Sequence, residues 1–300
     1  MKVGLIDVDS HNFPNLALMK ISAYHKAQGD EVEWWWGWNE YDRVYMTKVF
    51  DNSYSPDREE PVNAKEIIKG GTGYDRKKEL PPEIEHMCPD YSLYPELTKD
   101  TAYGFLTRGC PNNCGFCMVC EKEGRESHKV ADLSEWWNGQ NNIVLMDPNL
   151  LACREHMDLL RQLSESRAWV DINQGLDARL LTPKNIEAIK QIKIKEIHFA
   201  WDLMKNSERI IAGLNLWKQL GKKNKHGSWG TVYVLVNFNT TMEENLYRIY
   251  TLREMGFDPY VMIYDKPHAE REIRLLQRWC NNKRIFKTTE RFEDYNPKLG

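Results

Sequence analysis

The 300-residue sequence lacks three features that would define a class of protein at once. No apolar run approaches the roughly 20 residues that a membrane-spanning helix needs. Acidic residues interrupt the N-terminal stretch after only a few positions, which argues against a signal peptide. The formal net charge is −3, so the chain has no positive excess that would attract nucleic acid or an anionic membrane. We therefore expect a cytoplasmic protein with no membrane partner, and the charge does not favour a nucleic-acid partner.

Cysteine is also scarce over most of the chain. None of the seven cysteines lies in residues 1–87, whereas four lie between Cys110 and Cys120. An odd, clustered set of cysteines does not build a disulfide framework and is typical of a reduced compartment. With 41% hydrophobic and 28% charged residues, the rest of the composition is that of an ordinary soluble protein with a sizeable core.

Residues 1–80 predict a small α/β domain. Apolar runs indicate four short strands, at residues 2–8, 31–36, 41–50 and 64–69, and one helix lies between the first two strands. This order is typical of a Rossmann-like unit with a largely parallel sheet. Residues 81–99 are rich in proline, charge and aromatic side chains, and we interpret them as a linker.

Residues 100–267 show a longer and more regular alternation. Six strands are expected, at residues 102–107, 142–146, 169–173, 196–200, 231–236 and 259–264. Helices with period-3.6 spacing are expected at residues 154–164, 183–192, 207–220 and 242–255. Repeated strand–helix units predict an α/β fold with a partial (β/α)6 TIM-like barrel. Residues 268–300 should form a C-terminal helix and tail.

Most of the potential metal-binding cysteines lie in the loop that follows the first of these six strands. Cys110, Cys114 and Cys117 have the spacing C-x3-C-x2-C, and Phe116 precedes the third cysteine. Thiolates gathered on a loop suit a soft metal. A structural zinc site would need a fourth ligand, commonly from a second pair of cysteines, and no such pair follows. An electron-transfer iron–sulfur site would use four cysteines, with Cys120 as the fourth.

This cysteine motif, placed directly after the first barrel strand, resembles that of the radical S-adenosylmethionine (SAM) superfamily over about residues 100 to 265. The resemblance implies that Cys110, Cys114 and Cys117 hold a [4Fe–4S] cluster whose open iron is chelated by the amino and carboxylate groups of SAM. The reduced cluster would then cleave SAM to a 5′-deoxyadenosyl radical. Phe116 would lie near the adenine. Cys120 falls outside the pattern, as a buried spare thiol or as a residue close to the cluster or substrate.

Ligands of parallel α/β barrels meet the carboxyl ends of the strands. Seven polar or aromatic residues at these ends are expected to contact SAM or substrate, although each also suits a helix cap or turn: Asp147, Asn173, Gln174, Arg179, Asp202, Asn237 and Tyr264. The resemblance implies that Asp147 supplies a carboxylate where the family often has a Gly-Gly-Glu segment. It also implies that Arg179 pairs with the SAM carboxylate and that Asp202 binds the ribose.

The N-terminal domain resembles a degenerate cobalamin-binding domain. Residues 70–74 and 89–95 are similar to segments of that branch, and Asp9-Ser10-His11 is similar to its D-x-H motif. The glycine that completes the motif is Pro14 here. Two roles of this domain therefore stay open: it binds cobalamin as a cofactor, or it is a degenerate domain used for packing or substrate docking.

The resemblance implies a radical SAM enzyme that acts on an unidentified small molecule, nucleotide or peptide. It would take its electron from an external donor such as flavodoxin or ferredoxin. Two alternatives stay open: an iron–sulfur or zinc module without SAM turnover, and a cobalamin-dependent radical SAM methyltransferase. The absence of cysteine from residues 1–87 disfavours a methylthiotransferase with a second cluster. Only Cys280 lies beyond the barrel, which disfavours a member with auxiliary clusters in a C-terminal extension.

Overall fold

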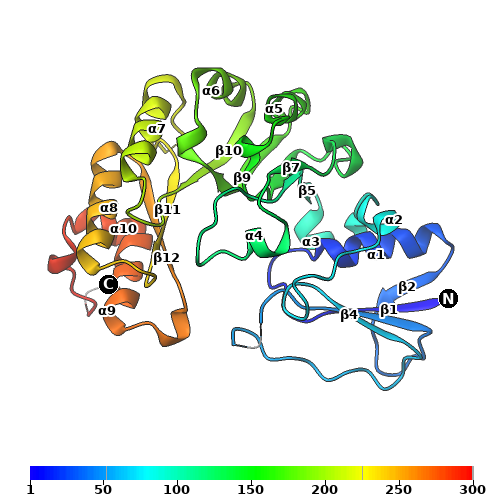
Figure 1. The fold of residues 1–300 in the computed structure, drawn as a ribbon. Helices are drawn as coiled ribbons and strands as arrows, with labels where there is room; N and C mark the ends of the chain where they lie inside the picture. Colours follow the sequence, from blue (N-terminus) through cyan, green and yellow to red (C-terminus); the bar gives the residue numbers. More distant parts are fainter. Residues whose placement is uncertain (52, 225, 299–300) are drawn as a thin grey trace. The chain divides into compact units, whose positions relative to one another are not determined.

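A computed structural model of the chain describes residues 1–51, 53–224 and 226–298, and it shows a mixed α/β protein (Figure 1). The strands are β1 Lys2–Asp7, β2 Glu31–Trp34, β3 Arg43–Thr47, β4 Ile67–Gly70, β5 Thr101–Gly104, β6 Thr107–Arg108, β7 His128–Lys129, β8 Asn142–Leu145, β9 Trp169–Leu176, β10 Lys193–Ala200, β11 Thr231–Val236 and β12 Asp258–Ile263. The α-helices are α1 Leu16–Ala27, α2 Pro82–Glu85, α3 Pro95–Thr98, α4 Val119–Lys122, α5 His156–Glu165, α6 Pro183–Lys190, α7 Ser207–Leu220, α8 Met242–Met255, α9 Arg271–Asn281 and α10 Lys283–Thr288. In the described part of the chain, no helix combines the length and the apolarity needed to cross a membrane.

The chain divides into two compact units, which are described separately. Unit 1 comprises Met1–Leu106 and Val130–Val144, and unit 2 comprises Thr107–Lys129 and Leu145–Gly300. Both units are discontinuous in sequence, because the segment that carries the cysteine loop belongs to unit 2 while the segment after it belongs to unit 1.

Unit 1 contains a four-stranded sheet in the order β2-β1-β3-β4, and each neighbouring pair is parallel. This confirms the predicted small α/β unit with a parallel sheet. Helix α1 connects β1 to β2 and is capped by Asn15, whose side-chain oxygen accepts a hydrogen bond from the Leu18 amide at 3.2 Å. The apolar side of α1 packs on the sheet through Leu18 and Ile21, which meet Val3 and Leu5 of β1.

Residues 81–99 contain short helices rather than only extended chain. Pro82 occupies the first turn of α2, where its fixed φ and missing amide hydrogen are compatible with a helix. Ile84 of α2 is 5% exposed and joins the apolar cluster of α1 and the sheet. The Tyr94 hydroxyl donates to Asp7 at 2.6 Å. This segment therefore contributes to the core of unit 1.

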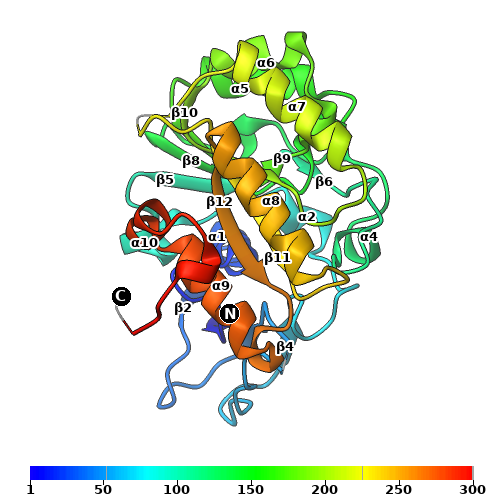
Figure 2. The same cartoon turned by 90° about the vertical axis from the view of Figure 1, so that its left-hand side faces the viewer.

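The second sheet has six parallel strands in the order β12-β11-β10-β9-β8-β5. The predicted α/β class with a long run of parallel strands is thus confirmed. In unit 2, helices α5 to α8 lie on one side of strands β9 to β12 (Figure 1). Figure 2 shows α8 running along β11 and β12.

The ends of α6 and α8 are fixed by capping residues next to them in the sequence. Thr182 accepts a hydrogen bond from the Asn185 amide at the start of α6, and Pro183 occupies the first helical position. Thr241 and Glu244 form a reciprocal capping box at the start of α8. Gly256 ends α8 with φ +81, a conformation that favours glycine.

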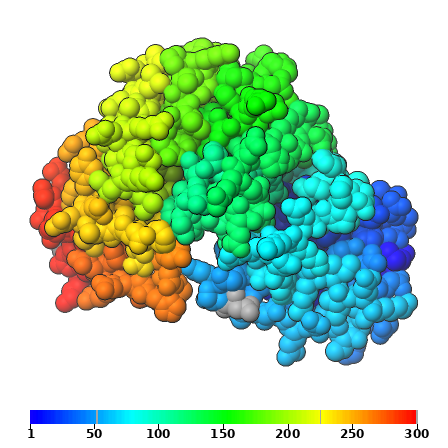
Figure 3. Space-filling view, viewed as in Figure 1, coloured from blue at the N-terminus to red at the C-terminus, as the bar shows by residue number. Residues whose placement is uncertain are grey.

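The C-terminal segment folds back against unit 2. Arg253 of α8 lies 3.9 Å from the ring centroid of Phe286 in α10. Trp279 of α9 is fully buried, and its ring lies 6.0 Å from that of Tyr250 and 4.9 Å from that of Phe286. In the space-filling view, the red C-terminal residues lie directly against the orange residues of unit 2 (Figure 3). Residues that follow the sixth strand are therefore part of the core of unit 2.

Candidate functional site

The cysteine loop begins at β6, directly after the buried Leu106. Gly109 has φ +80, and a Cβ atom there would lie 2.1 Å from the Glu126 carbonyl oxygen, so only glycine fits this close approach. The Glu123 carboxylate accepts hydrogen bonds from the Gly109 amide at 3.1 Å and from Arg108 at 2.7 Å. These contacts hold both ends of the loop together.

Cys120 closes the loop from the first turn of α4. Its thiol donates to the carbonyl oxygens of Cys110 at 3.1 Å and Asn112 at 3.0 Å. The Cys114 amide donates to Asn112, and the Cys117 amide donates to Cys114, each at 3.0 Å. Cys120 thus acts as a hydrogen-bond donor to the backbone of the loop that carries the other three thiols.

Cys110, Cys114 and Cys117 are free thiols that lie close enough to influence one another. Burial and, to a smaller extent, the neighbouring Cys117, Asp202 and Cys110 together raise the pKa of Cys114 to about 11, against the opposing effect of Arg179. Burial also raises the pKa of Cys117. A bound cation would reverse this effect, because it stabilises the thiolate form.

Among residues 1–51, 53–224 and 226–298, no group of three or more His, Cys, Asp or Glu side chains has an arrangement that could hold a metal ion. The donor set nevertheless suits a soft metal, since three mutually interacting thiols share one short loop. The Oδ1 atom of Asn149 is buried without a hydrogen-bond partner in the described structure, and Nδ2 of the same side chain lies 3.5 Å from the Cys110 sulfur. The chemistry of these residues therefore fits an iron–sulfur group.

Asp177 and Arg179 lie beside the loop, after β9. Asp177 binds the Arg179 guanidinium through both carboxylate oxygens, at 2.7 and 2.6 Å, and accepts from Asn112 of the loop at 3.0 Å. Burial opposes ionisation of Asp177, but the hydrogen bonds from Arg179 and Asn112 hold its pKa below the usual range. Arg179 was predicted from the sequence, whereas the role of Asp177 in orienting it was missed. The D-x-R spacing at the strand end could have indicated this pair.

Asp147 lies in the buried interior of unit 2 and is 3% exposed. One of its carboxylate oxygens accepts from the Thr107 amide at 2.8 Å and from the Thr107 hydroxyl at 2.6 Å. Asp147 therefore ties the end of β8 to the start of the cysteine loop. Its predicted contact with SAM stays a prediction.

Asp202 lies at the end of β10, within electrostatic range of Cys114. Burial raises the pKa of its carboxyl to about 6, against the opposing effects of the Leu235 amide and Arg248. Arg248 of α8 is fully buried and donates to the carbonyl oxygens of Trp201 at 2.7 Å, Asp202 at 2.6 Å and Leu235 at 3.0 Å. It thereby joins the carboxyl ends of β10 and β11. Sequence reasoning missed Arg248, because α8 reads as an ordinary amphipathic helix.

Three aromatic rings extend from the loop along the ends of β11 and β12. Phe116 meets Phe238 with ring centroids 5.5 Å apart, and Phe238 meets Tyr264 at 4.9 Å. Asn237 has φ +66, and its side chain donates to the Tyr264 carbonyl oxygen at 2.8 Å. The structure therefore brings together Phe116, Asn237 and Tyr264, which were predicted from separate parts of the sequence.

The remaining two predicted residues lie on β9. The carbonyl oxygen of Asn173 accepts from the Tyr233 hydroxyl at 2.9 Å, and Gln174 is exposed. Their predicted contacts with SAM stay predictions.

In unit 1, the motif Asp9-Ser10-His11 follows β1. The buried Asp9 carboxylate accepts from the amides of Val49 at 2.7 Å and Phe50 at 3.0 Å, so it caps the turn after β3. His11 is exposed at a positive φ of 20. The structure thus gives Asp9 a local role, and cobalamin stays an alternative prediction.

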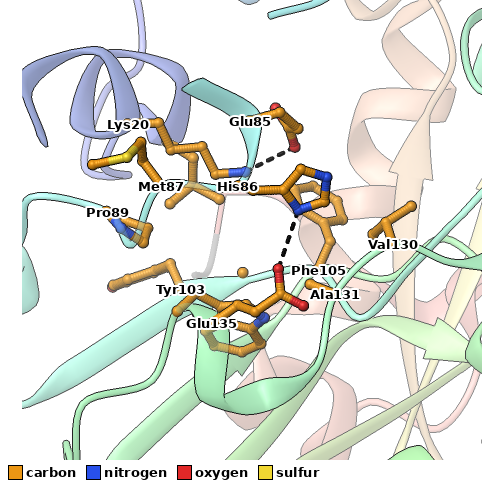
Figure 4. Close-up of a pocket in the computed structure, with 13 residues that line it drawn as sticks. Lys20, Glu85, His86, Met87, Pro89, Tyr103, Phe105, Val130, Ala131 and Glu135 are labelled. Atoms are coloured by element: carbon orange, nitrogen blue, oxygen red, sulfur yellow. Dashed lines mark hydrogen bonds and ion pairs between the residues drawn. The ribbon is translucent and has the colours of Figure 1, made fainter. Parts of the chain in front are cut away.

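Unit 1 also contains a small pocket between α1, α2 and the segment around Trp136 (Figure 4). Its volume is about 30 Å³, and it is bordered by ion pairs of Lys20 with Glu85 at 2.7 Å and of His86 with Glu135 at 3.1 Å. The indole nitrogen of Trp136 is buried there and has no hydrogen-bond partner in the described residues. The volume suits an ordered water rather than a cofactor.

A larger cavity of about 900 Å³ lies in unit 2, among residues of α8, α10 and the start of β12. Lys283 and Asp258 form an ion pair at 3.3 Å across its border. Because β12 begins at Asp258, this cavity lies at the opposite end of the strand from Tyr264 and the cysteine loop.

Comparisons with known proteins add no family. No family model matches the chain, and no curated protein matches its sequence. The candidate function therefore depends on the cysteine loop and on the side chains that surround it.

Proposed function

We propose that this protein is a radical SAM enzyme built on a partial TIM-like barrel. The observation that carries the proposal is the position of Cys110, Cys114 and Cys117 on a loop after the first strand of a six-stranded parallel sheet. The carboxyl ends of β9 to β12 supply polar and aromatic groups to the same site, as expected for a ligand of a parallel α/β protein.

In this proposal the three thiolates bind a [4Fe–4S] cluster. When bound, the reduced cluster would supply the electron that cleaves SAM and yields the 5′-deoxyadenosyl radical. Cys120 keeps its proton and donates it to two loop carbonyl oxygens, so it shapes the loop without being a ligand.

The other side chains bind and orient SAM. Asp177 holds Arg179 through Nε and Nη2, and we assign Nη1 to the SAM carboxylate, because arginine binds carboxylates in a defined plane. The rings of Phe116, Phe238 and Tyr264 form an apolar surface for the adenine. Asp202, held at the strand end by Arg248, supplies an acceptor for the ribose hydroxyls.

The decisive experiment is anaerobic reconstitution with iron and sulfide, followed by reduction and addition of SAM. We expect 5′-deoxyadenosine to form and the EPR spectrum of the reduced cluster to change on SAM addition. Absence of both effects would count against the enzyme. A colourless protein isolated with stoichiometric zinc would instead support a zinc module.

Two single-cysteine variants provide a matched comparison. Cys114→Ala should lose the iron–sulfur absorbance and 5′-deoxyadenosine formation. Cys120→Ser keeps a hydrogen-bond donor at the same position and should retain both. If Cys120→Ser loses the cluster while Cys114→Ala keeps it, the assignment of ligands is wrong.

A further inference from the structure

Strands β9 to β12 present two different faces. Side chains alternate along a strand, and one set, which includes Ile172, Phe199 and Val234, is buried. The other set is partly exposed and contains Asp171 and Asn173 on β9, Glu196 and His198 on β10, Tyr233 on β11, and Tyr260 and Met262 on β12. This second set forms the open face of the sheet.

Aromatic rings lie side by side on the open face. His198 stacks on Tyr233 with centroids 5.1 Å apart and an interplanar angle of 6°. Tyr233 in turn makes a T-shaped contact with Tyr260, with ring centroids 6.0 Å apart. Tyr260 is 43% exposed although it lies within a strand, opposite Tyr233 in the register. The sheet therefore offers an accessible aromatic ring whose exposed part the described core does not use.

The hydrogen bonds on this face leave acceptors available. The Tyr233 hydroxyl donates to the Asn173 carbonyl oxygen, so this tyrosine offers its ring rather than its hydroxyl. Nδ1 of His198 lies 3.0 Å from the Ile172 carbonyl oxygen. Because a carbonyl only accepts, Nδ1 carries a hydrogen, so Nε2 is the ring nitrogen that can accept a hydrogen bond when the ring is neutral.

Two carboxylates border the rings. Asp171 and Glu196 lie opposite each other in the register of β9 and β10. Oδ1 of Asp171 is buried and accepts no hydrogen bond in the described residues, and it lies 3.6 Å from Nδ1 of His198. Burial raises the pKa of Asp171, and Glu196 raises it further, while His198 and Lys195 act in the opposite direction. The net direction indicates that nearby positive charge does not compensate the carboxylate.

We propose that Asp171, Glu196, His198, Tyr233 and Tyr260 form the substrate-binding surface, and that the substrate carries a protonated amine on or near a planar ring. Carboxylates and the faces of tyrosine rings both attract a cation. Nε2 of His198 can accept a hydrogen bond from an ammonium group, and Tyr260 can stack on a ring. The identification of the bound molecule as a substrate rests on the proposed function, whereas its binding does not.

The test uses the full-length protein without iron or SAM and three probes of similar shape: 2-phenylethylamine, 2-phenylethanol and phenylacetate. Binding is measured by saturation-transfer NMR titration. The cationic amine should bind at least about tenfold more tightly than phenylacetate, which corresponds to about 1.4 kcal/mol. Equal affinities for the three probes would overturn the proposal.

Variants locate the binding surface. Asp171→Asn should weaken amine binding about tenfold, whereas Asp158→Asn on the outer helix α5 should not change it. Tyr260→Ala should weaken both the amine and the alcohol, whereas Tyr247→Ala on α8 should not. If Asp171→Asn and Tyr260→Ala both bind the amine with the affinity of the unmodified chain, the amine does not bind at the proposed surface.

Glu196→Gln provides a second carboxylate test if Asp171→Asn does not fold, and unchanged amine binding in this variant would also contradict the proposal. The result is independent of SAM cleavage. If the amine binds and no 5′-deoxyadenosine forms, the proposed function is wrong and the binding surface stands. If 5′-deoxyadenosine forms and the amine does not bind, only this inference is wrong.

Discussion

At the scale of single residues, Arg248 is a buried cation that serves the backbone rather than a carboxylate side chain. Its guanidinium donates to the carbonyl oxygens of Trp201, Asp202 and Leu235 and to the side-chain oxygen of Asn245. Burial lowers its pKa to about 10, although Asp202 acts in the opposite direction. Such a group stabilises the fold only because its donors are paired, so removing it leaves several buried acceptors without partners.

Arg248→Met should therefore destabilise the protein by about 3 kcal/mol, because buried carbonyl oxygens at two strand ends lose their donor. Urea unfolding followed by circular dichroism measures this change. Arg209→Met, on the exposed side of α7, is the matched control and should change stability by less than about 0.5 kcal/mol. Equal midpoints for the two variants would show that Arg248 does not join the strands.

At the scale of elements, α9 protects the free edge of the six-stranded sheet. Asn281 of α9 accepts from the Val261 amide at 2.8 Å and donates to its carbonyl oxygen at 3.0 Å. Gln277 donates to the same carbonyl oxygen at 3.1 Å. These side chains replace the strand that would otherwise pair with β12, and an unpaired edge would favour aggregation.

Asn281→Ala should lower the free energy of unfolding by about 1 to 3 kcal/mol, because the Val261 amide loses its buried partner. The variant should also aggregate at a lower temperature than the unmodified chain when followed by light scattering. Glu272→Ala lies on the exposed side of the same helix and should change neither property. A stable Asn281→Ala variant would mean that the edge is protected by other contacts.

At the scale of the whole molecule, metal loading should couple to stability. Burial and neighbouring thiols raise the pKa of Cys114 and Cys117, and the cation of the proposed cluster would remove this cost of ionisation. A ligand that binds only the folded state, present at 100 times its dissociation constant, stabilises by about 2.7 kcal/mol.

Anaerobic reconstitution with iron and sulfide should therefore raise the unfolding temperature by about 4 °C, measured by differential scanning calorimetry. Removal of the iron with a chelator should reverse the shift. Cys114→Ala should show no shift, and the same shift in this variant would place the metal elsewhere.

Local sequence determined much of this protein. The apolar runs and the capping pairs Thr182–Asn185 and Thr241–Glu244 act over a few residues, so the strands of the two parallel sheets and the longer helices could be predicted from neighbours alone, whereas the short helices α2 and α3 could not. The spacing of the cysteines is equally local. Two expectations tied to more distant parts of the chain, a parallel N-terminal sheet and a run of parallel strands after residue 100, also agree with the structure.

Tertiary structure decided which side chains of the candidate site are already engaged. Asp147 looked available for a ligand, yet its carboxylate holds Thr107, forty positions earlier in the chain. Cys120 looked like a spare thiol and is a donor to the loop, while Arg248 and His198 gave no signal in the sequence. The physical reason is that a polar side chain gains its role from the partner it meets after folding, and that partner is set by sheet register and helix packing rather than by adjacent residues.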